Sequence, residues 1–209
     1  MKILLCAATP MEMFHSAFPG SEVDRVITGI GIAHTAFTLG AFLANTSVDL
    51  CLQIGIAGTF NPDLEIGSVV AVQKDCFADL GVEDHDRFVH ITEALALDTQ
   101  TAFDRLWIQP EDQLISQLDL PVVTAITVNT THGNRQSIDK VISKYPAEIE
   151  SMEGAPFFAA CMTAGIPCLQ IRAISNLVEP RNKSNWNIPL AIHRLHQEVE
   201  RILPKLHLD

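Results

Sequence analysis

The sequence predicts an α/β fold: a single domain with a mixed, largely parallel central β-sheet flanked by helices. Short apolar runs of strand length alternate along the chain with segments of helical period, which is the pattern of a parallel sheet covered by helices. Hydrophobic residues make up 47% of the 209 residues and charged residues only 19%, so a sizeable core is expected. Since no internal repeat, low-complexity tract or Pro/Gly linker divides residues 1–209, we expect one domain.

Seven segments are expected to form strands, because each is a short apolar run bounded by turn residues. They span residues 2–8, 23–28, 48–57, 67–73, 122–128, 147–151 and 167–175. The last segment leads into Asn176, so a polar amide is expected where a buried strand reaches the edge of the sheet. The carboxyl ends of parallel strands are where α/β proteins bind ligands.

Four segments have helical period, namely residues 32–44, 135–144, 153–164 and 189–203. In the last, apolar residues recur at spacings of three and four and predict one apolar stripe: Ile192, Leu195, Val199, Ile202 and Leu206. Residues 76–119 are more polar and carry several acids. We expect them to form connections and a short helix at the periphery of the sheet.

Charge and cysteine usage limit the partner and the compartment. The 14 basic and 25 acidic side chains give a net charge of -11, which repels nucleic acid and anionic membranes and favours a small-molecule partner. The 5 cysteines are unclustered and mostly inside apolar runs, so we expect buried free thiols and a reducing compartment. Thr9 and Pro10 interrupt the first apolar stretch well short of the ~20 residues that span a bilayer. A cytoplasmic protein without a membrane segment is therefore expected.

Three familiar kinds of site lack the residues that they need. Gly29-Ile30-Gly31 follows a strand and precedes a helix, but His34 stands where a dinucleotide-binding motif has its third glycine, so a tight turn is preferred. His193 and His196 have no third ligand nearby, and a solvated helix face is expected rather than a metal site. There is no G-x-S-x-G elbow of a serine hydrolase. We therefore expect neither a cofactor nor a metal.

Two glutamates are candidate site residues by their position. Glu12 follows the first predicted strand, and Glu153 opens a predicted helix beside Gly154, a residue too small to block a ligand. At either position a glutamate can also serve only to start a helix, so position leaves both interpretations open. Two carboxylates and an amide at strand ends suit a sugar–base bond better than a metal, a phosphate or a flavin.

Five short motifs together carry a resemblance to a known superfamily. They are Met11-Glu12, Gly29-Ile30-Gly31, Gly55-Ile56-Ala57-Gly58, Met152-Glu153-Gly154-Ala155 and Arg172-Ala173-Ile174-Ser175-Asn176. In this order and spacing they resemble, over nearly the whole chain, the purine nucleoside phosphorylases and the methylthioadenosine/S-adenosylhomocysteine nucleosidases. The stretch from Ser175 to Arg181, followed by Trp186, is similar more specifically to the futalosine hydrolases of that superfamily. The resemblance implies a nucleoside phosphorylase-like fold.

The resemblance also implies roles for individual residues. Glu12 matches the glutamate that activates the attacking water, and Arg172 matches an arginine beside that water. Glu153 matches the acceptor of hydrogen bonds from the ribose 2'- and 3'-hydroxyls, and Met152 matches a methionine packed on the sugar. Asn176 occupies the position of the aspartate that recognises the purine in nucleosidases.

Departures from the family pattern bear on the substrate and the nucleophile. An asparagine at position 176 offers an NH2 donor to a 6-oxo group, which favours hypoxanthine or guanine over adenine. The substrate-binding turn Ile56-Ala57-Gly58 has Ile56 where nucleosidases have serine, and Gln53 stands in the region where an arginine for phosphate would be expected. Water is therefore the expected nucleophile. Arg181 and Trp186 are candidates for binding the benzoate of futalosine.

The expected function is hydrolysis of futalosine to hypoxanthine and dehypoxanthinyl futalosine, without cofactor or metal. One alternative is a purine nucleosidase or phosphorylase for inosine-like or methylthio-nucleosides. An alternative of another class is a nucleoside-binding protein that has lost the chemistry. The mean hydropathy of +0.20, together with the oligomers formed by superfamily members, predicts a homo-oligomer of at least two copies.

Overall fold

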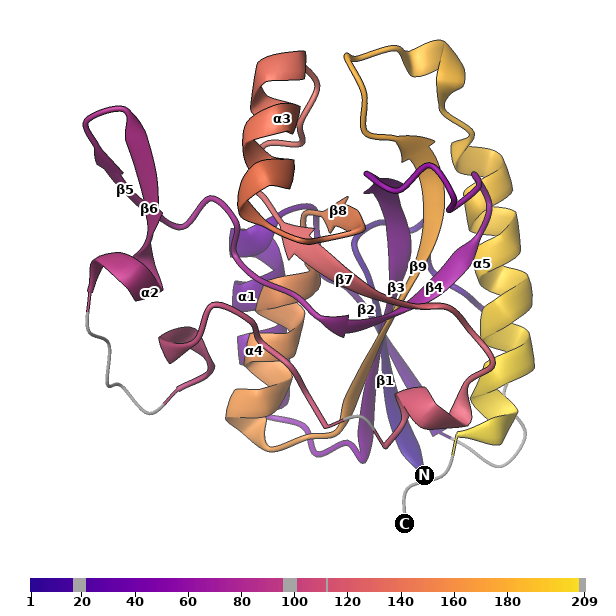
Figure 1. Ribbon diagram of the computed structural model, residues 1–209. Helices are drawn as coiled ribbons and strands as arrows, with labels where there is room; N and C mark the ends of the chain where they lie inside the picture. The colour runs from indigo at the N-terminus through magenta and orange to yellow at the C-terminus, as the bar shows by residue number, and fades with distance from the viewer. Residues whose placement is uncertain (17–21, 96–100, 112, 207–209) are drawn as a thin grey trace.

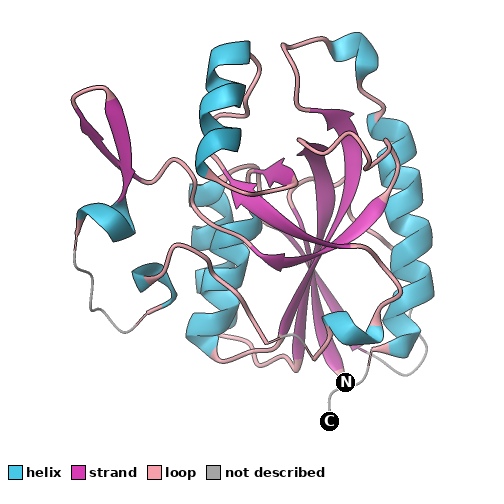
Figure 2. Ribbon diagram, in the orientation of Figure 1, coloured by secondary structure: helices cyan, strands magenta, loops and turns pink. Residues whose placement is uncertain are grey.

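A computed structural model describes residues 1–16, 22–95, 101–111 and 113–206, and within them a seven-stranded mixed sheet lies between two layers of helices (Figures 1 and 2). The predicted fold class, a mixed and largely parallel α/β sheet flanked by helices, is confirmed. The strands are β1 (Lys2–Ala7), β2 (Glu22–Ile27), β3 (Leu50–Thr59), β4 (Val69–Lys74), β7 (Val122–Thr127), β8 (Ile149–Ser151) and β9 (Cys168–Leu177). All seven coincide with the predicted apolar runs to within three residues at each end.

The sheet closes on itself. Its order is β2-β1-β3-β8-β7-β4-β9, and β3 also pairs with β9, so that five strands form a ring from which β1 and β2 extend. Most pairings are parallel, while β3 with β8 and β4 with β9 are antiparallel. Closure brings the carboxyl ends of β1, β3 and β9 to one edge of the sheet.

Helices cover both faces of the sheet (Figure 1). α1 (Ile32–Leu43) and α4 (Gly154–Ala164) pack together on one face, and α5 (Ile188–Ile202) covers the other. α3 (Arg135–Lys144) begins after Asn134, whose side chain caps it by accepting from the backbone N–H of Ser137. The four predicted helices are confirmed, and α5 buries the expected stripe through Leu195, Val199 and Ile202.

Alternation along β1 divides the core into two layers. Ile3 and Leu5 pack with the α5 side, whereas Leu4 and Cys6 pack with the α1 and α4 side. All five cysteines are free and buried, as predicted. Within the described ranges, none of the helices has the length and apolar character needed to cross a membrane.

The segment 76–119 contains an element that the sequence pattern did not predict. β5 (Gly81–Asp84) and β6 (Arg87–His90) form a two-stranded hairpin that projects from the rest of the fold, and the short helix α2 (Ile91–Ala94) follows it (Figure 1). The hairpin is mostly exposed, so its residues carry no alternation between a buried and a solvated face. The short peripheral helix was predicted. Residues 96–100 and 112 of this segment lie outside the described residues.

Candidate active site

A cavity of about 390 Å³ lies at the edge of the sheet where β1, β3, β8 and β9 end. Seven of the nine predicted site residues line it: Glu12, Ile56, Ala57, Gly58, Met152, Glu153 and Asn176. Arg172 is fully buried in β9 beside Gly55 and does not line the cavity itself. Arg181 is exposed, and its guanidinium lies 5.1 Å from the ring centre of Trp186, which does line the cavity.

Glu12 lies in a turn after β1 and does not start a helix. Its Oε2 accepts hydrogen bonds from the backbone N–H (3.0 Å) and the hydroxyl (2.7 Å) of Thr9. Its Oε1 accepts from the backbone N–H of Ile56 in β3 at 3.1 Å. The carboxylate is thus fixed across two strand ends while only 6% of the residue is exposed.

His196 contributes to this arrangement, which corrects the prediction of a solvated face. It is partly buried on α5, and its Nε2 lies 3.0 Å from the backbone carbonyl oxygen of Glu12. Its ring also contacts Phe14 edge-on. His193, one turn earlier on the helix, is exposed as expected.

Glu153 precedes α4 at the N-cap position, but its side chain makes no cap hydrogen bond. Instead, Oε1 accepts from the backbone N–H of Gly31 at 3.1 Å, and Oε2 lies 3.7 Å from Nη1 of Arg172. Burial raises the pKa of Glu153 above its usual range, and the guanidinium of Arg172 opposes that rise. The glutamate therefore faces the cavity and its arginine, not the helix end.

Arg172 is held by two glutamines inside the sheet. Its Nε donates to Oε1 of Gln170 at 2.9 Å, and its Nη2 donates to Oε1 of Gln53 at 2.8 Å. A Cβ on Gly55 would overlap Nη1 of Arg172 and would lie 3.2 Å from Oε1 of Glu12. Gly55 is thus the point at which the arginine approaches Glu12, and Nη1 of the same arginine lies 3.7 Å from Oε2 of Glu153.

Asp75 extends this buried network away from the cavity. Its Oδ1 accepts from the backbone N–H of Cys76 (2.8 Å) and the hydroxyl of Thr127 (3.0 Å), and Oδ2 lies 3.5 Å from Nε2 of Gln170. Neither Asp75 nor Gln170 was predicted as a site residue, and Gln53 was noted only where an arginine would be expected. The available signal was a glutamine inside an apolar strand, in Leu52-Gln53-Ile54 and again in Leu169-Gln170-Ile171.

Asn176 lies near the end of β9, on the side of the cavity formed by Gly58. Its Nδ2 donates to the backbone carbonyl of Leu177 at 3.0 Å, and its Oδ1 accepts from the hydroxyl of Ser175 at 2.8 Å. These two contacts set the orientation of the amide and leave the second hydrogen of its NH2 group for a ligand.

His132 and Glu150 also line the cavity, although neither was predicted from the sequence. Nδ1 of His132 lies 2.6 Å from Oε2 of Glu150, and its backbone N–H donates to Oε1 at 3.0 Å. The loop that carries His132 also accepts a hydrogen bond from the backbone of Arg181 through the carbonyl of Gly133. The two residues are 18 positions apart, in a loop and a three-residue strand, so no spacing in the sequence linked them.

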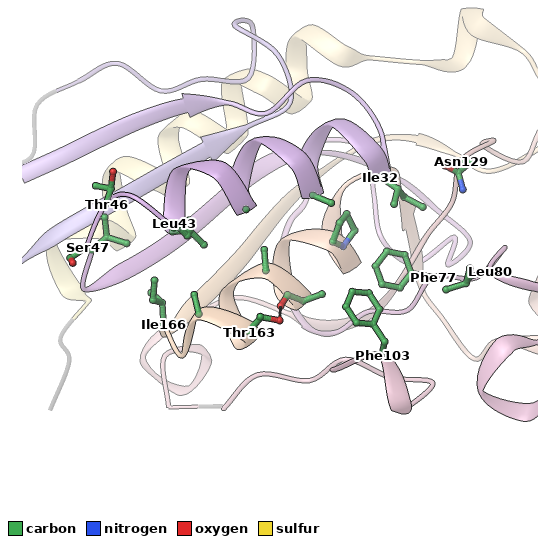
Figure 3. A pocket seen from close by; sticks show the side chains of 18 of the residues that line it. Ile32, Leu43, Thr46, Ser47, Phe77, Leu80, Phe103, Asn129, Thr163 and Ile166 are labelled. Carbon is green, nitrogen blue, oxygen red and sulfur yellow. Dashed lines mark hydrogen bonds between the residues drawn. The ribbon is translucent and has the colours of Figure 1, made fainter. Parts of the chain in front are cut away.

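A larger hollow of about 810 Å³ lies between α1 and α4 (Figure 3). Small and apolar residues form most of its wall, with Phe77 and Phe103 stacked at one end. None of the nine predicted site residues lines it, and the three buried glutamates, Glu12, Glu150 and Glu153, line the smaller cavity instead. The smaller cavity is therefore the candidate active site. Among the residues that the structure describes, no group of three or more His, Cys, Asp and Glu side chains is placed to hold a metal ion.

Comparisons with known proteins agree on a family and a fold. The sequence profile described as "Phosphorylase superfamily" matches residues 12–204. The chain is 30% identical over 178 residues to the futalosine hydrolase of Thermus thermophilus, covering 84% of this chain and 79% of that protein. It is 29% identical over 233 residues to the futalosine hydrolase of Streptomyces coelicolor, covering 99% and 97%.

A solved structure extends the likeness to the fold. The S-adenosylhomocysteine nucleosidase from Streptococcus pyogenes, in complex with 5-methylthiotubericidin, superposes with a TM-score of 0.81 at 21% identity, covering 100% of this chain and 98% of that chain. At that identity the likeness concerns the fold alone.

Proposed function

We propose that the chain, which belongs to the phosphorylase superfamily, hydrolyses the N-glycosidic bond of futalosine and releases hypoxanthine and dehypoxanthinyl futalosine. This reaction is a step of menaquinone biosynthesis by the futalosine route. The proposal has two levels, and the general one is that a purine nucleoside is the substrate and water the nucleophile. The specific one is that the nucleoside is futalosine, and it is supported by the futalosine hydrolases among the chain's relatives.

The observation that carries the proposal is that Arg172 lies beside Glu12 at Gly55 and beside Glu153, while Asn176 lies elsewhere in the wall of the cavity that both glutamates line. Cleavage of a glycosidic bond develops positive charge on the sugar and negative charge on the departing purine. Two buried carboxylates suit the first charge, and a fixed amide donor suits the second. The cavity has both.

The roles are those that the resemblance to the nucleosidases implies for these positions. Glu12 takes a proton from a water whose oxygen attacks the anomeric carbon of the ribose. The bond from that carbon to N9 breaks, its electron pair leaves with the purine, and a proton from the water ultimately neutralises the base. Glu153 accepts hydrogen bonds from the ribose hydroxyls, and Met152 packs against the sugar. Arg172 positions Glu153, whose Oε2 lies 3.7 Å from its Nη1.

The wall of the cavity favours water over phosphate as the nucleophile. Among the described residues that line it, none is a lysine or an arginine. The guanidinium of Arg172 is already engaged by Gln53, Gln170 and Glu153. Phosphate binding in a buried site generally needs a cation with donors to spare.

The test is to incubate the purified protein with futalosine in phosphate-free buffer and to follow hypoxanthine release. Release that does not depend on added phosphate is expected, with inosine and methylthioadenosine as comparison substrates. If inosine is cleaved and futalosine is not, the futalosine assignment is wrong. If cleavage requires phosphate, the protein is a phosphorylase.

A purine nucleosidase of other specificity is the second candidate. It is favoured by weaker likeness to an aminodeoxyfutalosine nucleosidase from Helicobacter pylori, 25% identical over 179 residues. A nucleoside-binding protein without chemistry is the third candidate, because Ile56 and Asn176 depart from the nucleosidase pattern. Calorimetry that detects tight futalosine binding without turnover would favour this third candidate over the enzyme.

A homo-oligomer of at least two copies remains a proposal. It is supported by the apolar hollow between α1 and α4 (Figure 3) and by exposed apolar side chains on the same helices, Phe37 at 80% and Met162 at 41%. Light scattering at micromolar protein is expected to give a mass of two chains or more. A monomer mass would contradict the proposal. Cytoplasmic location is likewise a proposal.

A further inference from the structure

Gly58 of β3 lies between two polar cavity residues. It is the register partner of Glu150 in β8 and of Asn176 in β9. Register partners on neighbouring strands direct their side chains to the same face, so the carboxylate and the amide flank the glycine. A Cβ on Gly58 would lie 3.1 Å from Nδ2 of Asn176 and 2.8 Å from Cγ2 of Val178. The missing side chain therefore keeps the space beside Asn176 open.

Glu150 determines which nitrogen of His132 carries a hydrogen. The glutamate is 4% exposed, and both of its oxygens are bound by His132, through the backbone N–H at 3.0 Å and through Nδ1 at 2.6 Å. A carboxylate oxygen is the acceptor in such a contact, so we assign the hydrogen to Nδ1. In the tautomer with its hydrogen on Nδ1, Nε2 is an acceptor, and among the described residues it has no hydrogen-bond partner. Phe60 packs edge-on against the ring and helps to fix it.

A purine presents opposite groups to such an acceptor depending on its substituent at position 6. A 6-oxopurine carries a hydrogen on N1, whereas a 6-aminopurine has a lone pair there. O6 is bonded to C6, and C6 is the ring neighbour of N1, so a base whose O6 is bound by Asn176 needs an N1 partner close to Asn176. His132 and Glu150 are the polar side chains across Gly58 from that amide.

We propose that the His132–Glu150 pair determines purine specificity by accepting the N1 hydrogen of a 6-oxopurine at Nε2 of His132. The inference rests on the proposed function, since it names what the same site selects. Asn176 and His132 together recognise adjacent positions of the base. A 6-aminopurine meets Nε2 with a lone pair, and this repulsion disfavours it independently of Asn176.

The test uses the substitution Glu150→Gln, which is expected to move the imidazole hydrogen of His132 from Nδ1 to Nε2. The amide oxygen of the glutamine can still accept from the backbone N–H of His132, while its NH2 donates to Nδ1. Nε2 then carries the hydrogen and becomes a donor, which suits N1 of a 6-aminopurine. The ratio of kcat/KM for futalosine to that for aminodeoxyfutalosine is expected to fall by about 10- to 100-fold. Glu148→Gln, two residues earlier and outside the cavity wall, is the matched control and is expected to leave the ratio unchanged.

Binding of the free bases provides a readout that does not depend on turnover. Calorimetry is expected to give a Kd ratio of hypoxanthine to adenine that rises in Glu150→Gln relative to the unmodified protein. His132→Phe keeps a ring in the wall and removes the acceptor, so it is expected to weaken the preference for hypoxanthine without creating one for adenine. It also serves if Glu150→Gln does not fold.

The outcomes separate the two proposals. If the unmodified protein leaves futalosine intact, the proposed function fails, and the base-binding ratio still tests the pair. If Glu150→Gln leaves both the turnover ratio and the base-binding ratio unchanged, His132 and Glu150 do not recognise N1. If Glu150→Gln does not fold, the same conclusion follows from unchanged ratios in His132→Phe.

Discussion

Replacing the buried carboxylate Asp75 with asparagine is expected to change how protein stability depends on pH. Asp75 is fully buried, and its oxygens accept from Cys76, Thr127 and Gln170. Burial raises its pKa from 3.8 to about 6, against the hydrogen bond from Thr127 and the positive charge of Arg172. In the unfolded chain the side chain ionises at its ordinary pKa.

The sign of the effect follows from the raised pKa. The folded state holds the proton more tightly than the unfolded state, so the contribution to stability is fully present below pH 3.8 and is lost as the pH rises through about 6. The difference between the two pKa values corresponds to about 3 kcal/mol in total, of which about 1.4 kcal/mol is lost between pH 5 and pH 8. A neutral asparagine has no such dependence.

Urea unfolding of both proteins at pH 5 and pH 8 measures the effect. Asp75→Asn is expected to be the less stable protein at pH 5, because its NH2 group would face the donor Nε2 of Gln170. Its disadvantage in unfolding free energy is expected to shrink by about 1.4 kcal/mol at pH 8. Asp63→Asn, the same change at an exposed side chain, is the control. A difference between the unmodified protein and Asp75→Asn that is equal at both pH values would refute the reasoning.

Three further substitutions test the proposed roles of cavity residues. Asn176→Asp removes the NH2 donor to O6 and puts an oxygen beside the carbonyl of Leu177, so kcat/KM for futalosine is expected to fall about 10- to 100-fold relative to aminodeoxyfutalosine; an unchanged ratio means that Asn176 does not contact position 6. Glu12→Gln keeps one acceptor but loses the base, and kcat for hypoxanthine release is expected to fall about 100-fold or more. Full activity in a folded variant rules Glu12 out as the base. Arg181→Ala is expected to raise KM for futalosine by about 3- to 10-fold without affecting inosine, whereas an unchanged KM removes Arg181 from the benzoate site.

Secondary structure was predictable because the hydrophobic pattern of this chain is strong. The strand Cys168–Leu177 is buried along most of its length, and its apolar run is correspondingly continuous. The closure of the sheet was not predictable, because the pairing of β3 with β9 joins segments more than 100 residues apart and leaves no mark in either. The antiparallel hairpin at residues 81–90 was missed for a different reason, since it packs little of its surface and needs no apolar face. That residues 1–209 form one domain remains a prediction.

The candidate site was found by resemblance more than by position. Position alone left Glu12 and Glu153 as possible helix starts, and only the folded contacts with Ile56 and Gly31 direct both carboxylates into one cavity. Their partner Arg172 was identified, but the glutamines that hold it were not. A single glutamine in an apolar strand is tolerated in many proteins when it forms a hydrogen bond, so no pattern in the sequence connects Gln53 with Gln170.

The glycines near the two glutamates make room for buried side chains and not for a ligand. Gly154 was expected to leave room for a ligand, yet a Cβ there would overlap Oδ2 of Asp75 and the amide of Gln170. Gly55 likewise gives its space to Arg172. Both glycines therefore admit the network behind the cavity. A buried arginine is costly unless its charge is compensated and its donors are satisfied. Glu153, which faces the cavity, and Asp75, which faces the core, both lie near the guanidinium of Arg172 and compensate its charge. The arginine therefore links the candidate site to the interior of the sheet.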